Sequence, residues 1–542
     1  MTDQTDTAES NEATRHYDVA IIGAGFGGLY ALHHLRSLGL SVRVFDGAGD
    51  VGGTWWWNCY PGASVDIPSA PFYGFTFSEE LAQEWDWKDR QPSQPEVLSY
   101  LKFVADKFDL RRDIQLNTWI KGATFDEASA RWILTTDDGK AAAAQFLVCA
   151  VGTLSAANLP NIPGIDTFAG ECYHTGRWPH EPVSFEGKRV GVIGTGSSGV
   201  QAIPIIAKSA AELTVFQRTP QYAIPARNGP IDAEYQKEVQ RDWANYRDFM
   251  MNTLTGMPYP LVERSALDDT PEQRQELFES LWEQGGFRML FGGYNDLMIN
   301  EEANATISEF VRGKIREIVK DPETCAKLMP DYMLGTKRLI LDEGYFETYN
   351  RSNVTLVDLR NEPITHISAN AVNTEQQEYP LDMLVLATGY DAITGTLMRL
   401  NPRGRDGVDL QTVWRDRFST HLGMVIPNFP NLFMIHGPES PSVLHNMPLA
   451  GELQADWIGE CIQYLNNKDL ATIESAPGME VAWRQSTEEA ATHTLFHQGE
   501  SWYTGSNIDG KHRQFVVHMG GKAYFDVLDD VAANGYPGFI VA

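Results

Sequence analysis

Two glycine patterns of the form G-x-G-x-x-G are the first features of the chain that indicate chemistry. The first comprises Gly23, Gly25 and Gly28, and an aspartate, Asp46, stands 18 residues after its last glycine. Glycines in such a loop let the backbone approach a pyrophosphate at the positive end of a helix, and an acid at this distance accepts hydrogen bonds from ribose hydroxyls. Because a carboxylate repels a 2′-phosphate, this loop predicts a site for FAD or NAD and argues against NADP.

The second pattern comprises Gly194, Gly196 and Gly199, and here an arginine, Arg218, stands 19 residues after the last glycine, with Thr219 behind it. A guanidinium at this place pairs with a 2′-phosphate through two parallel hydrogen bonds. The second loop therefore predicts NADPH in preference to NADH. The alternative is that Arg218 makes an ordinary ion pair at the surface.

Each loop is flanked by the elements that a nucleotide-binding unit needs. A short apolar run precedes the loop, a stretch with helical spacing follows it, and a second apolar run ends at Asp46 or Arg218. Two more runs end in similar A-x-G motifs and are expected to close the two units. The expected fold is α/β, with two Rossmann-like dinucleotide-binding domains. The predicted strands are 17–22, 41–45, 188–193 and 213–216, the predicted helices are 29–38 and a stretch ending near 210, and the A-x-G runs are 146–152 and 384–391.

Length and composition set further bounds. With 542 residues, the chain exceeds the length that one hydrophobic core supports, so two or three domains are expected. Its formal net charge of −29 repels nucleic acid and anionic membranes, and no apolar run approaches the length of a membrane span. The five cysteines contain no C-x-x-C pair, which argues against a metal site or a redox dithiol and suits a reducing cytoplasm.

Composition also divides the chain. Residues 1–16 are polar and acidic and are expected to form a disordered tail. Residues 230–332 are charged, and helix-start signals at Thr270-Pro271-Glu272-Gln273 and Asp321-Pro322-Glu323 predict a helical insertion there. The expected division then assigns the rest to an FAD-binding domain, residues 17–155 and 390–542, and to an NADPH-binding domain, residues 156–229 and 333–389.

The stretch between the two glycine loops carries a family resemblance. Phe168, Gly170, His174, Trp178 and Pro179 form the pattern F-x-G-x-x-x-H-x-x-x-W-P, which resembles a fingerprint of type I Baeyer–Villiger monooxygenases. Those enzymes use FAD and NADPH to insert one oxygen atom of O2 next to a ketone carbonyl. We interpret His174 as a structural hinge between domains, not as an acid or base. The two aromatic residues are interpreted as packing anchors, and the glycine as a point of close backbone approach.

A second stretch resembles another fingerprint of that family, G-x-W-x-x-x-x-Y-P-G-x-x-x-D. It runs from Gly53, Thr54 and Trp55 to Asp66. The resemblance implies that the first three residues contact the cofactor and that Asp66 lies near the flavin, where it partners a catalytic arginine. The alternative for Asp66 is a turn or cap residue. Ser64 stands where the family often has arginine, so the local charge differs.

A Lys337-Arg338 dipeptide precedes the apolar run that returns to the second unit. Without a family context such a dipeptide is usually a surface feature. The resemblance implies that Lys337 helps Arg218 to hold the 2′-phosphate, and that Arg338 is the catalytic arginine above the flavin, held by Asp66. A fixed guanidinium in a dry site would stabilise the flavin C4a-peroxide anion and the negative adduct that it forms with a ketone.

The C-terminal part supplies candidates for substrate and cofactor contact. Residues 501–511 resemble the family's mobile loop, in which a tryptophan folds over the nicotinamide cofactor, and Trp502 takes that role by resemblance. Asp509 stands where proline is common, and residues 518–526 depart from the family's usual basic ending. A small-residue loop after 431–436 contains four candidate pocket residues, for which core packing is an equally good explanation: Ser442, Val443, Leu444 and Met447.

The sequence therefore predicts an NADPH-dependent, FAD-containing Baeyer–Villiger monooxygenase that converts a ketone and O2 into an ester or lactone through a C4a-peroxyflavin. We expect it to be cytoplasmic, a monomer or weak oligomer, and without nucleic-acid or membrane partners. A flavin N- or S-hydroxylating monooxygenase is the main alternative, but its linker usually ends in Phe or Tyr where this chain has Trp178-Pro179. The missing C-x-x-C argues against a disulfide reductase, and nothing requires a non-catalytic redox sensor that binds both cofactors.

Overall fold

The first sheet carries the first glycine loop. In the computed structural model, which describes residues 15–259, 262–518 and 520–542, seven strands form this sheet in the order β3-β2-β1-β6-β5-β4, and β17 also pairs with β6. β5 pairs antiparallel with both β4 and β6, and the other pairings of this sheet are parallel. The strands are β1 (Arg15–Ile22), β2 (Val42–Phe45), β3 (Ile114–Gln115), β4 (Ile120–Asp126), β5 (Arg131–Thr136), β6 (Ala141–Cys149) and β17 (Leu432–Met434).

The prediction that residues 1–16 form a disordered tail is wrong for its last two residues. Arg15 and His16 already belong to β1, where they pair with Ala142 and Ala143 of β6. Backbone pairing with a neighbouring strand therefore overrides the polar composition of these two residues. The rest of the predicted tail, residues 1–14, lies outside the described residues.

The second sheet carries the second glycine loop, and its five strands are all parallel in the order β12-β9-β8-β16-β7. Both loops show the predicted succession of strand, loop, helix and strand, which is β1-α1-β2 in the first sheet and β8-α5-β9 in the second. The α/β prediction is confirmed. The strands are β7 (Glu171–His174), β8 (Arg189–Ile193), β9 (Glu212–Gln217), β12 (Val354–Asp358) and β16 (Met383–Leu386).

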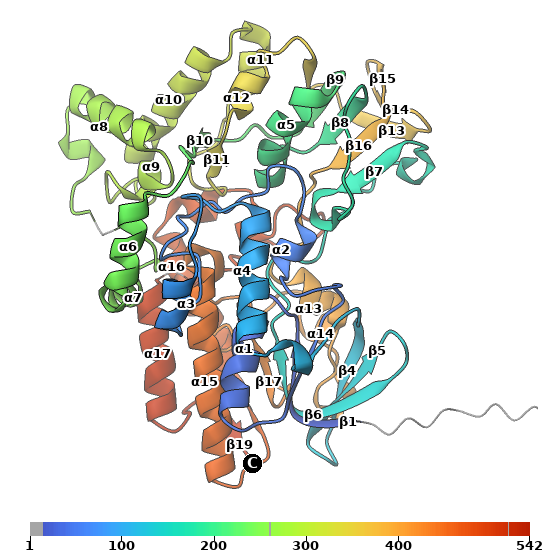
Figure 1. Ribbon diagram of the computed structural model, residues 1–542, viewed down its shortest axis with the longest axis vertical. Helices are drawn as coiled ribbons and strands as arrows, with labels where there is room; N and C mark the ends of the chain where they lie inside the picture. The colour runs from blue at the N-terminus through green and yellow to red at the C-terminus, as the bar shows by residue number, and fades with distance from the viewer. Residues whose placement is uncertain (1–14, 260–261, 519) are drawn as a thin grey trace, which may run out of the picture.

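Helices α1 (Phe26–Ser37) and α5 (Ser197–Ser209) begin directly after glycines of the two loops. In α1, Leu29, Leu32 and Leu35 recur at helical spacing and are fully buried, and burial of each stabilises the fold by about 1.5–3 kcal/mol. The long helix α15 (Met447–Asn467) packs beside α1. Figure 1 shows the first sheet with α1 and α15 in the lower half and the second sheet with α5 in the upper half.

The predicted insertion over residues 230–332 contains helices and no strand among its described residues. Thr270 and Gln273 make the predicted reciprocal capping bonds at the start of α8, and Asp321 caps α11. These helices lie together on the left and top of Figure 1. The division of the chain into domains stays a prediction. The helices are α6 (Ala233–Arg241), α7 (Trp243–Asn252), α8 (Pro271–Gln284), α9 (Arg288–Phe291), α10 (Glu301–Ile318) and α11 (Pro322–Lys327).

Smaller elements connect these parts. Three small sheets pair β10 (Ala223–Pro225) with β11 (Ile340–Asp342), β18 (Ile473–Ser475) with β19 (Phe539–Val541), and β14 (Ala371–Thr374) with β13 (Ile364–Ser368) and β15 (Glu378–Pro380). The other α-helices are α2 (Thr54–Trp57), α3 (Glu79–Glu84), α4 (Gln94–Lys107), α12 (Tyr345–Thr348), α13 (Gly395–Leu400), α14 (Leu410–Val413), α16 (Met479–Thr492) and α17 (Gly521–Ala533).

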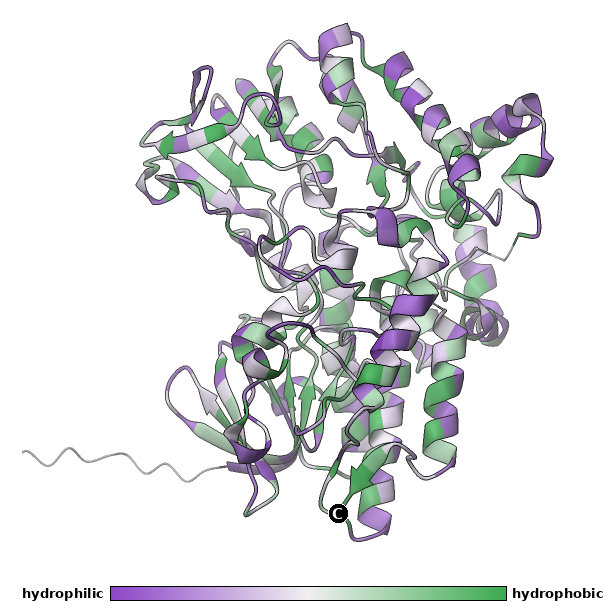
Figure 2. Cartoon of the chain, turned by 180° about the vertical axis from the view of Figure 1, so that it is seen from behind, coloured by the Kyte–Doolittle hydropathy of each residue, from purple (hydrophilic) through white to green (hydrophobic). Residues whose placement is uncertain are grey.

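Hydropathy follows this arrangement. In Figure 2 the strands of the sheets are mostly hydrophobic, and the helices around them alternate between hydrophobic and hydrophilic residues. The largest fully buried side chains include Trp132 and Phe146 in the first sheet and Phe216 in the second. Within the described ranges, no helix combines the length and the apolar character needed to cross a membrane.

Candidate active site

Asp66 and Arg338 form an ion pair although 272 positions separate them in the sequence. The Arg338 guanidinium donates to Oδ2 of Asp66 from Nε at 3.0 Å and from Nη2 at 2.7 Å. The side chains are 22% and 33% exposed, so the pair is partly shielded from water. The structure thus brings together the two residues predicted to be catalytic.

Contacts to α5 hold the loop that carries Asp66. The Tyr60 hydroxyl donates to Oε1 of Gln201 at 2.7 Å, and Nε2 of Gln201 donates to the carbonyl oxygen of Ser64 at 3.1 Å. Gly62 has a φ of +82°, and a Cβ there would lie 2.4 Å from the Gln201 carbonyl oxygen. The loop therefore docks on the second nucleotide-binding unit, and Ser64 takes part in that docking without adding charge.

Arg338 lies just before β11 and has three further neighbours. Its Nη1 donates to the carbonyl oxygen of Val443 at 3.0 Å, the ring of Phe287 lies 5.0 Å from its guanidinium carbon, and the Tyr503 hydroxyl interacts with it. Burial opposes the charge, but the Asp66 carboxylate and then Tyr503 outweigh burial and raise the pKa of Arg338 above its ordinary value. Arg338 is therefore a permanent cation.

The first glycine loop has the shape that a bound pyrophosphate requires. Gly23 has a φ of +108°, and a Cβ on Gly28 would lie 1.9 Å from the Gly23 carbonyl oxygen. Helix α1 begins without a side-chain cap, so its first N–H groups are available to an anion. Asp46 accepts from the backbone N–H of Ala24 at 2.6 Å and of Ala48 at 2.8 Å, and burial raises its pKa. These residues fit the adenosine diphosphate part of FAD.

Residues of the second fingerprint touch this loop. A Cβ on Gly53 would lie 2.8 Å from the Cα of Gly25, and Gly53 has a φ of +53°, so this position requires glycine for the close approach. Helix α2 begins with Thr54 and Trp55, directly after Gly53 in the sequence. Nε1 of Trp55 donates to the Tyr73 hydroxyl at 3.0 Å. The predicted cofactor-contacting residues therefore surround the first glycine loop.

The second glycine loop repeats this construction. Gly194 has a φ of +104°, and a Cβ on Gly199 would lie 2.4 Å from the Gly194 carbonyl oxygen, whereas a Cβ on Gly196 would meet nothing within 4 Å. Helix α5 also begins without a side-chain cap. Arg218 is exposed at the end of β9, and no carboxylate of the described residues pairs with it. Thr219 accepts a hydrogen bond at its carbonyl oxygen from the Thr195 hydroxyl at 3.1 Å.

Residues 500–503 meet the Lys337-Arg338 dipeptide. Nζ of Lys337 donates to the carbonyl oxygen of Glu500, and Tyr503 interacts with Arg338. Burial lowers the pKa of Lys337, and the nearby charge of Arg218 lowers it further. Two basic groups thus stand together at the second loop, as a 2′-phosphate requires. The ring of Trp502 contacts the Tyr503 ring in a tilted arrangement, with 4.3 Å between their centroids.

The four candidate pocket residues lie where β17 leads into α15. Val443 contacts Arg338 through its carbonyl oxygen, as described above. Ser442 is fully buried with a φ of +42°, and its hydroxyl has no partner among the described atoms. Leu444 and Met447 are partly buried. The structure therefore brings one of the four into contact with the Asp66–Arg338 pair.

The His174 ring, in the linker, is bonded at both nitrogens. Nδ1 accepts from the Gly176 N–H at 2.9 Å, and Nε2 lies 3.3 Å from the Thr388 hydroxyl, which donates to the carbonyl oxygen of Asn158. Burial lowers the pKa of His174, so the ring is neutral and Nε2 carries its hydrogen. The ring ties the linker to the segment after β16, in agreement with a structural role.

The other residues of the linker fingerprint pack against their surroundings. A Cβ on Gly170 would lie 2.4 Å from the carbonyl oxygen of Asp382, which explains the need for glycine. Trp178 is buried, and its ring centroid lies 5.3 Å from that of Tyr173. Two members are partly buried: Phe168 and Pro179.

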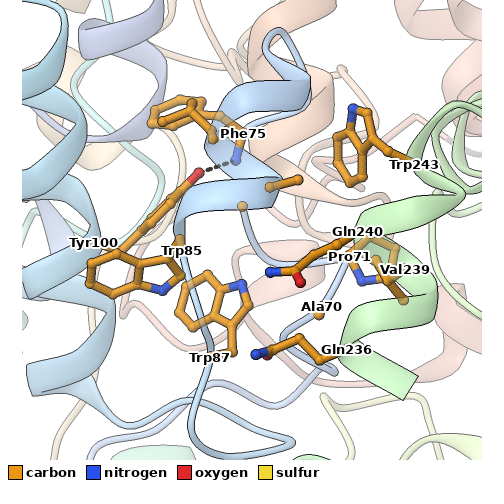
Figure 3. A pocket seen from close by; sticks show the side chains of 13 residues that line it. Ala70, Pro71, Phe75, Trp85, Trp87, Tyr100, Gln236, Val239, Gln240 and Trp243 are labelled. Carbon is orange, nitrogen blue, oxygen red and sulfur yellow. Dashed lines mark hydrogen bonds between the residues drawn. The ribbon is translucent and has the colours of Figure 1, made fainter. Parts of the chain in front are cut away.

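A separate small cavity lies between the segment around residues 70–87 and helices α6 and α7 (Figure 3). Its volume is about 30 Å³, and aromatic side chains such as Trp85, Trp87 and Tyr100 line it. Nε1 of Trp85 and Oε1 of Gln236 are buried without a partner in the described part of the chain, so the space suits a bound water molecule. None of the predicted site residues lines this cavity.

Comparison with known proteins decides the family. The pattern of the flavin-binding monooxygenase-like family matches residues 16–239. The chain is 44% identical to a phenazine N-monooxygenase of Lysobacter antibioticus, over 97% of each chain. A solved structure of oxidised steroid monooxygenase bound to NADP is 45% identical with a TM-score of 0.91, covering 97% of this chain and 99% of that one. A cyclohexanone 1,2-monooxygenase of an Acinetobacter species is 41% identical over 96% of each chain. This chain belongs to the Baeyer–Villiger monooxygenases.

Sequence reasoning misses three residues that build the site of this Baeyer–Villiger monooxygenase. Tyr503 follows the predicted Trp502 directly, so the same loop pattern could have indicated it. Phe287 and Gln201 carry no such signal, because a phenylalanine in a helical insertion and a glutamine within a helix are ordinary in sequence. Only the folded chain brings them to Arg338 and to the loop that carries Asp66.

Proposed function

We propose that this Baeyer–Villiger monooxygenase oxygenates a ketone to an ester or lactone at a site built on Arg338 and Asp66, with FAD as its flavin and NADPH as its reductant. The ion pair between these two residues carries the proposal. Oxygen insertion next to a carbonyl builds negative charge on the carbonyl oxygen, and a permanent cation with a fixed direction stabilises that charge without reorganisation.

The two glycine loops would hold the two cofactors. FAD, once reduced by NADPH, supplies the activated oxygen that is inserted. Its pyrophosphate would lie at the start of α1 and its ribose at Asp46, and the pyrophosphate of NADPH would lie at the start of α5. The residues proposed for FAD are Gly23, Gly25, Gly28, Asp46, Gly53, Thr54 and Trp55, and those for NADPH are Gly194, Gly196, Gly199, Arg218, Thr219, Lys337 and Trp502.

The hydrogen bonds of Arg338 leave part of the guanidinium free to act. A guanidinium has five N–H groups, and three of them serve Asp66 and Val443. Tyr503 also interacts with the guanidinium, and the remaining donor capacity would serve the ketone oxygen. Asp66 prevents the head group from rotating, and the Phe287 ring at 5.0 Å covers one side and reduces its contact with water.

Replacement of Arg338 tests the proposal. In Arg338→Ala, with cyclohexanone as the probe ketone, lactone formation should fall by at least about 100-fold, the size typical for loss of one preorganised charge-stabilising group. NADPH oxidation with release of hydrogen peroxide should continue. An unchanged rate of lactone formation would refute the role of Arg338.

Arg405→Ala is the matched control. Arg405 also pairs with a carboxylate, donating from Nε to Glu474 at 2.7 Å, and also lies over an aromatic ring, that of Phe125 at 5.7 Å. It lies away from the glycine loops and the Asp66–Arg338 pair. Its replacement removes an equivalent set of contacts, so lactone formation by folded protein should stay within about twofold of the parent.

N-oxygenation is a second candidate function, because a relative of 44% identity is a phenazine N-monooxygenase. The two functions share cofactors and differ in product. Incubation with NADPH and either cyclohexanone or phenazine, followed by mass spectrometry, separates them. A lactone without N-oxide supports the proposed function, and an N-oxide without lactone supports the second candidate.

We further propose a cytoplasmic enzyme without nucleic-acid partners. The net charge of −29 repels nucleic acid, and the five cysteines are all unpaired, which suits a reducing compartment. A monomer or weak oligomer stays a prediction.

A further inference from the structure

The segment between β17 and α15 contains three non-glycine residues in the left-handed region of backbone conformation. His436, Glu439 and Ser442 have φ angles of +56°, +67° and +42°. The side chains of Glu439 and Ser442 are fully buried, and His436 is buried as well. Such conformations cost about 1–3 kcal/mol each and persist only where surrounding contacts impose them, often at functional sites. Glu439 is the residue of the three whose side chain makes the most contacts.

The Glu439 carboxyl group joins three segments. Its Oε2 accepts from the backbone N–H of Thr420 at 2.8 Å, and its Oε1 accepts from Nε2 of Gln514 at 3.2 Å. Its backbone N–H donates to the carbonyl oxygen of Val516 at 2.9 Å, and its carbonyl oxygen accepts from Nε1 of Trp483 at 3.0 Å. These contacts hold the strained backbone of Glu439 in place.

Hydrogen-bond counting indicates that this carboxyl group carries a proton. The Thr420 hydroxyl lies 2.8 Å from Oε2 of Glu439 and also 2.8 Å from the carbonyl oxygen of Pro438. A hydroxyl has one hydrogen and cannot donate to both oxygens. If Glu439 is protonated, it donates to the Thr420 hydroxyl, which in turn donates to Pro438. The protonated form therefore satisfies every close contact, whereas the ionised form leaves one pair of acceptors facing each other.

The same contacts lead to Arg338 by two routes. Val516, which accepts the Glu439 N–H, donates its own N–H to the carbonyl oxygen of Tyr503 at 3.0 Å. Tyr503 in turn interacts with the Arg338 guanidinium. Along the chain, Glu439 lies four residues before Val443, whose carbonyl oxygen accepts from Arg338. The contacts of Arg338 with Val443 and Tyr503 thus depend on segments that Glu439 holds together.

We propose that protonated Glu439 is a positioning residue that assembles the Val443 and Tyr503 contacts of Arg338. The inference rests on the role proposed for Arg338 and extends it to a residue that touches neither the ketone nor a cofactor. Loss of the Glu439 proton would leave its bond from the Thr420 N–H but remove its bond to the Thr420 hydroxyl, where two acceptors would then face each other, and would loosen both segments. Arg338 would keep its ion pair with Asp66 but lose the contacts with Val443 and Tyr503 that orient it. Less product would then form for each NADPH consumed.

The surroundings of Glu439 support a proton that is lost near neutral pH. Burial raises the pKa of Glu439 to about 8, although its bonds to Thr420 lower it. Among the charged side chains of α16, Arg484 lowers the pKa of Glu439 and Glu488 raises it, and two histidines lie on the neighbouring segments, His518 after Gln514 and His421 after Thr420. Burial lowers the pKa of both histidines to about 4, so neither changes charge between pH 7 and pH 9.

The test measures coupling, which is the amount of lactone formed per NADPH oxidised, with cyclohexanone at pH 7 and pH 9. The protonated fraction of a group with a pKa of about 8 falls about tenfold between pH 7 and pH 9. Coupling by the parent should therefore fall over this range with a midpoint near pH 8. In Glu439→Gln, the amide keeps a donor for the Thr420 hydroxyl at every pH, although its nitrogen cannot accept from the Thr420 N–H as Oε2 does. Its coupling should therefore stay level from pH 7 to pH 9.

Two further variants complete the experiment. Glu439→Leu removes all side-chain bonds and should lower coupling at pH 7 by about tenfold, while the affinity for FAD stays within about twofold. Glu452→Gln is the matched control, because Glu452 is also fully buried, bonds to the backbone N–H of Thr76, and has a pKa raised by burial to about 8. It lies on α15 without a contact to Arg338, so its coupling should keep the pH profile of the parent.

A Glu439→Gln variant whose coupling falls with the parental midpoint would overturn the proposal, and so would a folded Glu439→Leu variant with parental coupling at pH 7. If the Leu variant does not fold, the pH profile of the Gln variant still decides. The Arg338→Ala result is independent of both. Parental lactone formation by that variant would reject the role of Arg338 itself, whatever the Glu439 variants do.

Discussion

Asp66→Asn is the most informative change at the ion pair, because it removes a charge and keeps the shape of the side chain. Two unit charges about 4 Å apart interact by about 4 kcal/mol at an effective dielectric constant near 20. The side chains are 22% and 33% exposed, so solvent screening reduces this to about 1.5–3 kcal/mol. If that energy orients Arg338 during oxygen insertion, the rate of lactone formation should fall by about 10-fold to 100-fold.

The assay follows lactone formation and NADPH oxidation together, on protein whose FAD content and melting temperature Tm match the parent. We expect kcat for lactone to fall, while the KM for NADPH stays within about twofold because Asp66 is remote from Arg218. Asp382→Asn is the control, since Asp382 also makes a close ion pair, with Nη2 of Arg189 at 2.7 Å in the second sheet. Equal lactone formation by Asp66→Asn and Asp382→Asn would show that the charge of Asp66 does not orient Arg338.

Three other predictions concern separate parts of the molecule. Arg218→Ala should raise the KM for NADPH by about 10-fold or more and leave that for NADH unchanged, because one charge-assisted contact to the 2′-phosphate is lost; steady-state kinetics with both cofactors checks this. Gly170→Ala should lower the free energy of unfolding by about 1–3 kcal/mol, since its Cβ would lie 2.4 Å from the Asp382 carbonyl oxygen; thermal denaturation measures it. Glu452 has a folded-state pKa of about 8 and an ordinary value of 4.5, so its stabilising effect is complete below pH 4.5 and is lost as the pH rises to 8; the Tm of Glu452→Gln relative to the parent should therefore increase over that range.

Each of the three has a distinct contradicting outcome. Equal loss of affinity for NADPH and NADH in Arg218→Ala would place Arg218 away from the 2′-phosphate. A Gly170→Ala variant with parental stability would mean that the linker shifts to accept a methyl group. A constant difference in Tm between Glu452→Gln and the parent from pH 5 to pH 8 would show that Glu452 does not titrate in that range.

Local patterns made much of the fold predictable. The succession of strand, glycine loop and helix depends on residues close in sequence, and both α1 and α5 begin where the loops end. The capping bonds of Thr270 and Gln273 are equally local. The error at Arg15 and His16 has the opposite origin, because their place in β1 depends on pairing with β6, more than 100 residues away.

The environment of the ion pair was less predictable than the pair itself. The family resemblance indicated Asp66 and Arg338, but periodicity and composition could not place Phe287 beside the guanidinium or dock Ser64 on Gln201. These contacts join segments that come together only through the packing of the two sheets. Glu439 was missed for the same reason, since its partners Thr420 and Gln514 lie on other segments and a lone glutamate in a loop usually faces solvent.

Incorporation of isotopically labelled oxygen distinguishes oxygen insertion from release of hydrogen peroxide. The purified protein, loaded with FAD, is given NADPH, cyclohexanone and isotopically labelled O2, and the products are analysed by mass spectrometry. We predict a lactone that carries one labelled oxygen atom, formed by the parent and by Arg405→Ala but at least about 100-fold more slowly by Arg338→Ala. A parental yield of labelled lactone from Arg338→Ala would contradict it, and so would NADPH oxidation by the parent that yields only hydrogen peroxide with every ketone tried.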